Sequence, residues 1–268
     1  MTPTAEVPAA PVFDALRDAL RDEQPVALAT VTEGAGVGAK LLVGPGRDPL
    51  GTLGTPDLDR VVARDALGAL GAGTTVTRHY GRRGEAREAD VTVFIEAFAP
   101  PPRMVIFGAV DFTAALARVA KLLGYHVTVC DARAAFATAA RFPMADEVVC
   151  EWPDRYLARH GGDLGPRDAV CVLTHDAKFD VPAIVAALAT DVGYLGAMGS
   201  RRTHARRLER LREAGVDDAA LTRLLAPIGL DLGARTPEET AIAVCAEIIA
   251  RRTGRPAPSL RDAQGPIH

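Results

Sequence analysis

The feature that most constrains the fold is an alternation of short apolar runs with helical segments after residue 103. The apolar runs cover residues 104–107, 126–130, 147–150, 169–173 and 192–195. Helical patterns lie at residues 112–123, 134–141, 181–188 and 201–213, and a last helix runs from the capping box Thr236-Pro237-Glu238-Glu239 to about residue 252. Because strands that alternate with helices form parallel sheets with crossover helices, the pattern predicts a Rossmann-like, doubly wound parallel sheet.

Three consecutive prolines at positions 100–102 separate this part of the chain from a different one. Before them, helical patterns at residues 12–21 and 57–70 accompany β-like runs at 26–31, 40–43, 74–80 and 90–98. The glycine-rich loops at 33–38 and 44–46 either turn the chain or cradle a ligand. We therefore expect an α/β protein with a smaller α+β domain in residues 1–99 and the Rossmann-like domain in residues 100–268.

Composition excludes several classes of protein. The 268-residue chain has a formal net charge of −3, so it has no overall basic field for nucleic acid or an acidic membrane. Its first residues lack the pattern of a signal peptide, and no apolar stretch is long enough to span a membrane. The four cysteines show none of the close pairings of a zinc site or a redox dithiol. We expect a cytoplasmic protein that binds neither nucleic acid nor membranes.

The turn after the first strand of the predicted sheet departs from a dinucleotide-binding loop. A dinucleotide binder carries G-x-G-x-x-G there, whereas this chain keeps Gly108 and replaces the next two glycines with Val110 and Thr113. Asp111 places an anion, or a simple helix N-cap, where a phosphate would bind. Tight NAD binding in this loop is therefore disfavoured. After the second strand, however, Asp131 and Arg133 have the spacing at which dinucleotide binders contact a ribose and a phosphate.

Polar side chains follow the fourth and fifth predicted strands. They are Thr174, His175 and Lys178 after the fourth, and Gly199, Ser200, Arg201 and Arg202 after the fifth. Carboxyl ends of parallel strands meet at one edge of the sheet, and ligands bind there near the point where the strand order reverses. We expect strand four beside strand one, so these side chains should face Gly108 across one crevice. Their chemistry favours a site for an anion and a heterocycle.

Arg201 and Arg202 are unusual because they begin a predicted helix directly after the capping hydroxyl of Ser200. A helix N-terminus carries roughly half a positive charge, so cations there cost about a few tenths of a kcal/mol. An anionic ligand held by free backbone N–H groups and two guanidinium groups would explain them. The alternative is a solvated basic helix face. The neighbouring polar residues favour the ligand.

Simpler structural roles exist for some of these residues. A hydrogen bond to a nearby carboxylate such as Asp176 would account for His175 without any ligand. Asp180 is expected to be the N-cap of the helix that starts at residue 181. For Lys178, the structural and the functional role are equally open.

Two long motifs carry a resemblance to a known family. They are Gly196-Ala197-Met198-Gly199-Ser200-Arg201-Arg202-Thr203-His204 and Pro227-Ile228-Gly229-Leu230-Asp231-Leu232-Gly233-Ala234-Arg235-Thr236-Pro237-Glu238-Glu239. The chain resembles the XdhC/CoxI family, accessory proteins for molybdenum hydroxylases of the xanthine dehydrogenase type. Residues 129–133 and 174–176, with the looser N-terminal stretches 38–43 and 51–54, extend the resemblance over nearly the whole chain. The triple-glycine and cysteine-bearing variants of some relatives near Gly54 are missing, which argues against metal or sulfur transfer by the N-terminal domain.

The resemblance implies a maturation chaperone that binds the molybdenum cofactor, as molybdopterin or its dinucleotide form, and hands it to an apo molybdenum hydroxylase. The cofactor carries a phosphate and a polar pterin, which need anion donors with hydrogen-bonding groups beside them. We assign cofactor binding to ten residues, namely Gly108, Asp131, Arg133, Thr174, His175, Lys178, Gly199, Ser200, Arg201 and Arg202. Within this set, Ser200, Arg201 and Arg202 are expected to bind the phosphate or the oxo face, Thr174, His175 and Lys178 the pterin, and Asp131 a nucleotide ribose.

The resemblance suggests partners, whereas roles for the cysteines are suggested by their positions near the strand ends. A cysteine desulfurase is a second candidate partner, and a homodimer is expected for two-domain proteins of this type. Near the strand ends, Cys130, Cys150 and Cys171 are expected to pack as small hydrophobes. The alternative is a thiolate at Cys130 that ligates molybdenum or carries sulfur, because this residue adjoins Asp131.

Two competing functions stay open. An NAD(P)-dependent oxidoreductase is suggested by the fold and by the pair Asp131 and Arg133, but no nucleophile, base and orienting partner at a recognisable spacing supports catalysis. We therefore assign no catalytic and no metal-ligating residue and favour a non-enzymatic role. The other alternative is a protein–protein adaptor, in which the basic helix at residues 201–212 docks an acidic partner.

Overall fold

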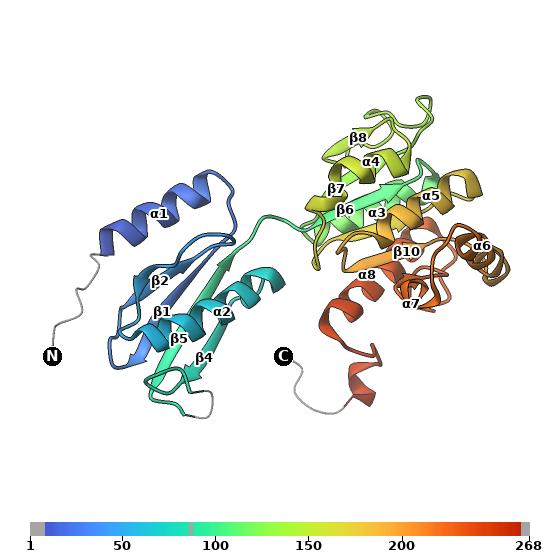
Figure 1. The fold of residues 1–268 in the computed structure, drawn as a ribbon. Coiled ribbons are helices and arrows are strands. Elements are labelled where there is room, and N and C mark those ends of the chain that lie inside the picture. The colour runs from blue at the N-terminus through green and yellow to red at the C-terminus, as the bar shows by residue number, and fades with distance from the viewer. Residues whose placement is uncertain (1–8, 86–87, 264–268) are drawn as a thin grey trace. The chain divides into compact units, whose positions relative to one another are not determined.

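The computed structural model describes residues 9–85 and 88–263 of the chain (Figure 1). The chain divides into two compact units, Met1–Pro100 and Pro101–His268. No helix among the described residues is both long and apolar enough to cross a membrane.

The N-terminal unit is an antiparallel sheet with a helix on each face. Its elements are α1 (Ala9–Arg21), β1 (Val26–Gly34), β2 (Lys40–Val43), β3 (Leu50–Thr52), α2 (Pro56–Ala72), β4 (Val76–Tyr80) and β5 (Val91–Phe98), and the strand order is β3-β2-β1-β5-β4. Side chains alternate along β1, so Ala27 and Ala29 pack under α2 whereas Val26 and Leu28 pack under α1. This unit is the α+β module that the sequence predicts.

The C-terminal unit is a parallel six-stranded sheet in the order β11-β10-β9-β6-β7-β8. Its elements are β6 (Arg103–Phe107), α3 (Asp111–Leu122), β7 (His126–Cys130), β8 (Glu147–Val149), α4 (Pro153–His160), η1 (Gly161–Asp163), β9 (Ala169–Val172), α5 (Ala177–Leu188), β10 (Tyr194–Ala197), α6 (Arg201–Glu213), α7 (Asp218–Leu221), β11 (Leu224–Leu225), α8 (Pro237–Thr253) and η2 (Leu260–Asp262). The strand order reverses between β6 and β9, as the sequence predicts, and this reversal is where doubly wound sheets bind ligands.

Helices cover both faces of this sheet. The apolar side chains of α3 and α8 share one core with alternate residues of β6, β7 and β9, including Met104 and Ile106. The other core joins Val105 and Phe107 to α4, α5 and α6, the last through Leu211. Burial of both faces explains why the strands read as continuous apolar runs. The α/β, Rossmann-like prediction is confirmed.

One predicted helix is wrong, and two α-helices among the described residues were missed. Residues 134–141 form successive turns between β7 and β8 and not a helix. The segment bends back to the sheet, which buries Phe142 in the core, and Pro143 follows directly. The missed helices are α4, which begins with Pro153 at its first turn, and the four-residue α7. Helix propensity is a weak guide, and tertiary packing overrides it in the alanine-rich segment.

Candidate functional site

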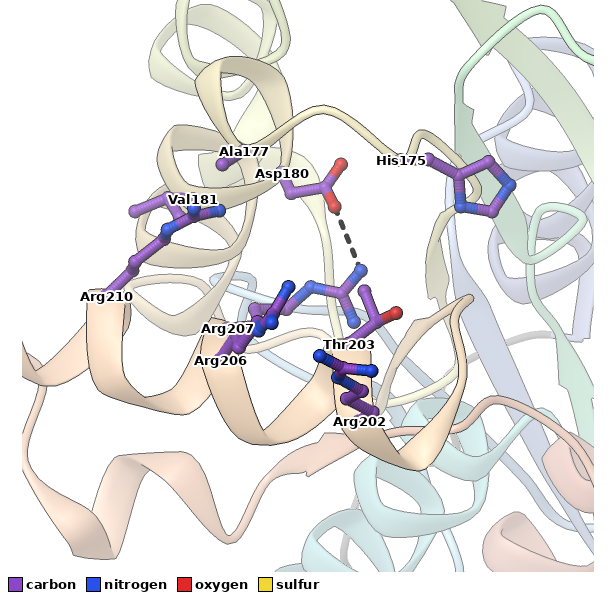
Figure 2. Close-up of a pocket in the computed structure, with 9 residues that line it drawn as sticks. All are labelled: His175, Ala177, Asp180, Val181, Arg202, Thr203, Arg206, Arg207 and Arg210. Carbon is purple, nitrogen blue, oxygen red and sulfur yellow. Dashed lines mark hydrogen bonds and ion pairs between the residues drawn. The ribbon is translucent and has the colours of Figure 1, made fainter.

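A pocket lies at the carboxyl edge of the parallel sheet, between the first turn of α5 and one face of α6 (Figure 2). Its volume is about 460 Å³, which is within the usual range for small-molecule sites. The lining residues are His175, Ala177, Asp180, Val181, Arg202, Thr203, Arg206, Arg207 and Arg210. Of the ten predicted site residues, His175 and Arg202 line this pocket.

The α6 side of the pocket is a row of arginines. Arg202, Arg206 and Arg210 are four residues apart, so they share one face of the helix. All three are exposed, and no described carboxylate pairs with any of them. Three guanidinium groups that share a face without a counter-charge create a local positive potential on a chain whose net charge is −3. The row can therefore attract an anion.

Arg207 lies beneath this row and is only 3% exposed. Its Nη2 donates to Asp180 Oδ2 at 2.9 Å and to the carbonyl oxygen of Met198 at 2.7 Å. Asp180 accepts a further hydrogen bond at Oδ1 from the hydroxyl of Thr174. In contrast, Nη1 of Arg207 is buried and has no acceptor among the described residues. A buried guanidinium is normally fully hydrogen-bonded, so a ligand oxygen here would supply the missing acceptor.

Asp180 is not the N-cap of its helix, so that prediction was wrong. Helix α5 begins one turn earlier, at Ala177, and Asp176 is the N-cap, with its Oδ1 accepting from Lys178 N at 3.1 Å. Asp180 therefore lies within the first turn, where it is 3% exposed and bonded to Thr174 and Arg207. Its role is to hold the buried arginine at the bottom of the pocket.

The turn from β10 into α6 positions the arginine row. Gly199 has a φ of +144°, and a Cβ atom there would lie 3.2 Å from Thr203 Cγ2, so the turn favours glycine. The Oγ of Ser200 caps the helix by accepting from Thr203 N at 3.1 Å. Arg201 is exposed and does not line the pocket, whereas Arg202 does. Of the two arginines at the start of α6, only Arg202 therefore contributes to the pocket.

The backbone N–H groups of the first βα turn are hydrogen-bonded within the protein. The N–H of Gly108 donates to Cys130 O at 2.9 Å, that of Ala109 to Asp131 Oδ2 at 2.8 Å, and that of Val110 to Thr113 Oγ1 at 3.3 Å. Gly108 packs against Thr174, since an added Cβ would lie 2.8 Å from Thr174 Cγ2. The N-cap of α3 is Val110, not Asp111, which is the first helical residue. These three N–H groups are thus unavailable to a phosphate.

Asp131 and Arg133 form a pair that closes the same turn. The Asp131 side chain is 2% exposed and accepts from Arg133 Nε at 2.9 Å and Nη2 at 2.7 Å, in addition to the Ala109 N–H. Burial alone would raise the pKa of Asp131, but the hydrogen bonds from Arg133 and the backbone together lower it below its usual value. Binding of Asp131 to a ribose stays a prediction, and it would require Arg133 to give way.

A small aromatic cluster adjoins this pair. The Arg133 guanidinium lies 4.5 Å from the ring centroid of Phe136, and the ring centroids of Phe179 and Trp152 are 4.9 Å apart. Lys178 is exposed, lies 3.4 Å from Asp176 Oδ2 and 4.8 Å from the Phe179 centroid, and is not a lining residue of the pocket. Of the predicted residues, Asp131, Arg133 and Lys178 thus belong to the region around this cluster.

The described cysteines are all free thiols. Burial, with the nearby charges of Glu151 and Asp131, raises the pKa of Cys130 to about 12, and its Sγ donates to Glu151 O at 3.4 Å. Burial also raises the pKa of Cys171 and takes that of Cys245 to about 11. Protonated, buried thiols are weak ligands and weak nucleophiles, so the thiolate proposed for Cys130 is disfavoured at neutral pH. Cys150 is exposed, so the prediction that it packs as a small hydrophobe was wrong.

The sequence reasoning missed the residues that define the pocket wall. From the sequence, Arg206, Arg207 and Arg210 belong only to a basic helix. The signal that could have found the outer wall is the spacing of four between Arg202, Arg206 and Arg210, which places them on one helical face. No local pattern marks Arg207 as buried, because its partner Asp180 is 27 residues away.

Comparison with known proteins relates the chain to one family. The family model of the XdhC Rossmann domain matches residues 104–248, and that of the XdhC and CoxI family matches residues 19–81. A solved structure from Bacillus halodurans, described as a xanthine dehydrogenase, aligns over 92% of this chain and 97% of its own with a TM-score of 0.55. It is 20% identical in sequence and supports the fold.

Curated relatives match parts of the chain. A protein of Bacillus subtilis (strain 168), named as a probable xanthine dehydrogenase subunit, is 34% identical over 160 residues, which is 60% of this chain and 46% of the relative. YqeB of Escherichia coli (strain K12) is 30% identical over 87% of this chain and 44% of its own length. The molybdenum cofactor insertion chaperone PaoD of Escherichia coli (strain K12) is 35% identical over 99 residues. This match covers 37% of this chain and 31% of PaoD. The chain spans less than half the length of each of these relatives.

Proposed function

This chain belongs to the XdhC and CoxI family, and we propose that it binds the molybdenum cofactor and acts in the maturation of a xanthine dehydrogenase-type molybdoenzyme. The names of two relatives, a molybdenum cofactor insertion chaperone and a probable xanthine dehydrogenase subunit, support this role. The proposed role is that of a cofactor carrier. The chemistry of the cofactor is then exercised in the recipient enzyme.

The observation that carries the proposal is the arginine-lined pocket with Arg207 at its base. The cofactor is an anion with a terminal phosphate, or a diphosphate in its dinucleotide form, next to a polar heterocycle. A row of three arginines without carboxylate partners among the described residues fits the phosphate end. The buried Nη1 of Arg207, which has no acceptor in the same part of the chain, fits an oxygen of this group. The pocket therefore has the chemistry that this cofactor requires.

Within this proposal, individual residues take distinct roles. Arg202, Arg206 and Arg207 bind the phosphate end, and His175 on the opposite wall donates to or accepts from the pterin. Thr174 acts indirectly, since its hydroxyl bonds to Asp180, which holds Arg207. Gly199 and Ser200 shape the turn that presents Arg202.

The predicted contacts of Lys178, Arg133, Asp131 and Arg201 with the cofactor stay predictions, because these side chains do not line the pocket. Gly108 stays a candidate through its contact with Thr174. If the bound cofactor extends beyond the pocket, these five positions are where further contacts are expected.

The proposed recipient is an apo molybdenum hydroxylase of the xanthine dehydrogenase type. A cysteine desulfurase as a second partner and a homodimer stay predictions from the family resemblance. The NAD(P)-dependent oxidoreductase has no support in the first βα turn, where the N–H groups of Gly108, Ala109 and Val110 are already bonded within the protein. The dinucleotide fingerprint relies on such groups for its pyrophosphate.

The direct test is co-purification of the cofactor. The protein is isolated from molybdate-supplied cells, and bound molybdenum and pterin fluorescence are measured for the wild type and for Arg202→Ala/Arg206→Ala. The matched control is Arg118→Ala, which removes an exposed arginine from α3, on the opposite face of the sheet. We expect molybdenum and pterin in the wild type and the control, and a loss of most of both in the double variant.

Equal retention by all three proteins would contradict the assignment of the pocket. Wild-type protein without molybdenum or pterin, but with undiminished binding to an apo-hydroxylase, would instead support the adaptor hypothesis. In that case the basic face of α6 would be a protein-docking surface.

A further inference from the structure

We infer that the arginine pocket takes a ligand that carries two linked phosphates, with the arginine row bound along the diphosphate and Arg207 bound to its innermost oxygen. This inference rests on the proposed function, since it names the form of cofactor that the pocket prefers. The dinucleotide form contains such a diphosphate, whereas molybdopterin itself carries a single phosphate.

The arginine row extends over about two turns of α6. Arg202 and Arg210 are eight residues apart on α6, so their backbones are separated by about 12 Å along the helix axis. A single phosphate can be held by two neighbouring guanidinium groups with forked hydrogen bonds. In Figure 2 Arg202 and Arg210 lie at the two ends of the row, so a single phosphate bound near one end lies away from the arginine at the other. A diphosphate extends along the row and meets all three.

The row has no other counter-ion among the residues that the structure describes. Elsewhere on the same helix Arg212 pairs with Asp218 at 2.9 Å, and Arg207 pairs with Asp180. Arg202, Arg206 and Arg210 have no carboxylate partner among the described residues. Like charges four residues apart on one helix face repel each other and destabilise the helix. A ligand that neutralises the entire row removes this repulsion, which one phosphate at either end would not.

The pocket offers arginines at two depths. Arg207 is 3% exposed, and its Nη1 is buried without an acceptor in the described part of the chain, whereas the row above it is exposed to solvent. An anion that reaches Arg207 and also engages the row must occupy two levels. The volume of about 460 Å³ leaves room for more than one phosphate group. Depth and length together favour a diphosphate.

The test is titration calorimetry on the full chain with inorganic phosphate and inorganic pyrophosphate as probes, at one salt concentration. Wild type should bind pyrophosphate at least about tenfold more tightly than phosphate. Arg210→Ala should weaken pyrophosphate binding about tenfold and leave phosphate binding unchanged, because a single phosphate can use Arg202, Arg206 and Arg207 alone. Arg118→Ala controls for the loss of one positive charge and should change neither.

Equal affinities of the wild type for the two probes, or an equal loss of both in Arg210→Ala, would overturn the inference. The substituted arginines at positions 118 and 210 are both exposed, so failure of these variants to fold is not an expected complication. The failure of the proposed function looks different. If molybdenum and pterin co-purify but the preference for pyrophosphate is missing, the protein carries the cofactor without a diphosphate. If the preference is present but molybdenum is absent, the diphosphate belongs to another ligand, which mass analysis of the purified protein identifies.

Discussion

Two βα turns of the C-terminal unit lie at the same edge of one sheet but differ in whether their polar groups are hydrogen-bonded within the protein. The turn after β6 bonds its N–H groups to Cys130, Asp131 and Thr113. The turn after β10 leads into a helix face with three arginines that have no carboxylate partner among the described residues. The first turn is internally satisfied, and the second is left open to solvent.

The difference shows how a Rossmann-like sheet can move its anion site. In dinucleotide binders, free backbone N–H groups at the first helix bind the pyrophosphate. Here Asp131 has turned inward and accepts the Ala109 N–H, so that site is closed by a side chain of the neighbouring strand end. The guanidinium groups of α6 offer stronger, charge-assisted hydrogen bonds in its place. Substitutions at Arg207 in α6, and at Gly108 and Asp131 around the turn after β6, test this difference.

The largest effect is expected from Arg207→Met. This variant leaves Asp180 buried without its cation, and removal of one partner of a buried ion pair costs about 3–5 kcal/mol of the free energy of unfolding. Denaturant unfolding at pH 7 measures it. The double variant Arg207→Met/Asp180→Leu should recover much of the stability, since an apolar pair can replace a buried ion pair. It should not recover pyrophosphate binding.

A double variant that regains both stability and pyrophosphate affinity would show that Arg207 has only a structural role. In that case the arginine row alone would be the anion site. A double variant as unstable as the single one would show that the Thr174 hydroxyl, which also bonds to Asp180, is the group left unsatisfied.

A smaller effect is expected from Gly108→Ala, in the closed turn. The φ of +111° is one that side chains rarely adopt, and the new Cβ would lie 2.8 Å from Thr174 Cγ2 and 3.0 Å from Thr174 N. We expect a loss of about 1–3 kcal/mol in the free energy of unfolding. The folded protein should keep its pyrophosphate affinity, because this turn offers no anion ligand. A selective loss of affinity with unchanged stability would mean that the first turn contacts the ligand after all.

The smallest effect, and one that depends on pH, is expected from Asp131→Asn. Asparagine can still accept from Ala109 N but loses its ionic hydrogen bonds to Arg133, so the variant should be less stable by about 1 kcal/mol at pH 7. The folded protein holds the pKa of Asp131 below its unfolded value. The aspartate therefore contributes stability that is fully present above the unfolded pKa of about 4 and is lost as the pH falls from there through the folded pKa.

Denaturant unfolding of wild type and Asp131→Asn between pH 7 and pH 3 tests this sign. The difference between the two proteins should be largest near neutral pH and should shrink in acid. A difference that grows as the pH falls would show that burial, not the hydrogen bonds from Arg133, dominates at Asp131.

Much of the fold could be predicted from local pattern. The apolar run of β7 and the helix α6 have the predicted bounds, because the run is short and continuous and the helix is preceded by its capping residue, Ser200. The helix predicted at residues 134–141 was wrong because burial of Phe142 in the core outweighs the helix propensity of this segment. The edge strand β11 is only two residues long, too short for any periodic signal.

The candidate site was predicted less well, and for a different reason. His175 and Arg202 were placed at the correct edge because sheet topology alone sends strand ends there. The assignments of Arg201 and Lys178 depended on side-chain direction, which changes with each residue along a helix. Asp180 was given the role of its neighbour Asp176, since both are capping residues by type. Only the start of the helix distinguishes them.

By itself the sequence determined the parallel sheet and the basic character of α6, since each follows from periodicity and residue type within single segments. The point where the strand order reverses followed from the doubly wound topology that this alternation of strands and helices implies. The tertiary structure decided which acidic groups reach which basic ones. Asp180 pairs with Arg207, which is 27 residues away in the sequence, and Asp131 accepts from the Ala109 N–H, which is 22 residues away. The row from Arg202 to Arg210 has no carboxylate partner among the described residues. Pairing of charges depends on distances of a few ångströms between segments, and no local pattern contains that information.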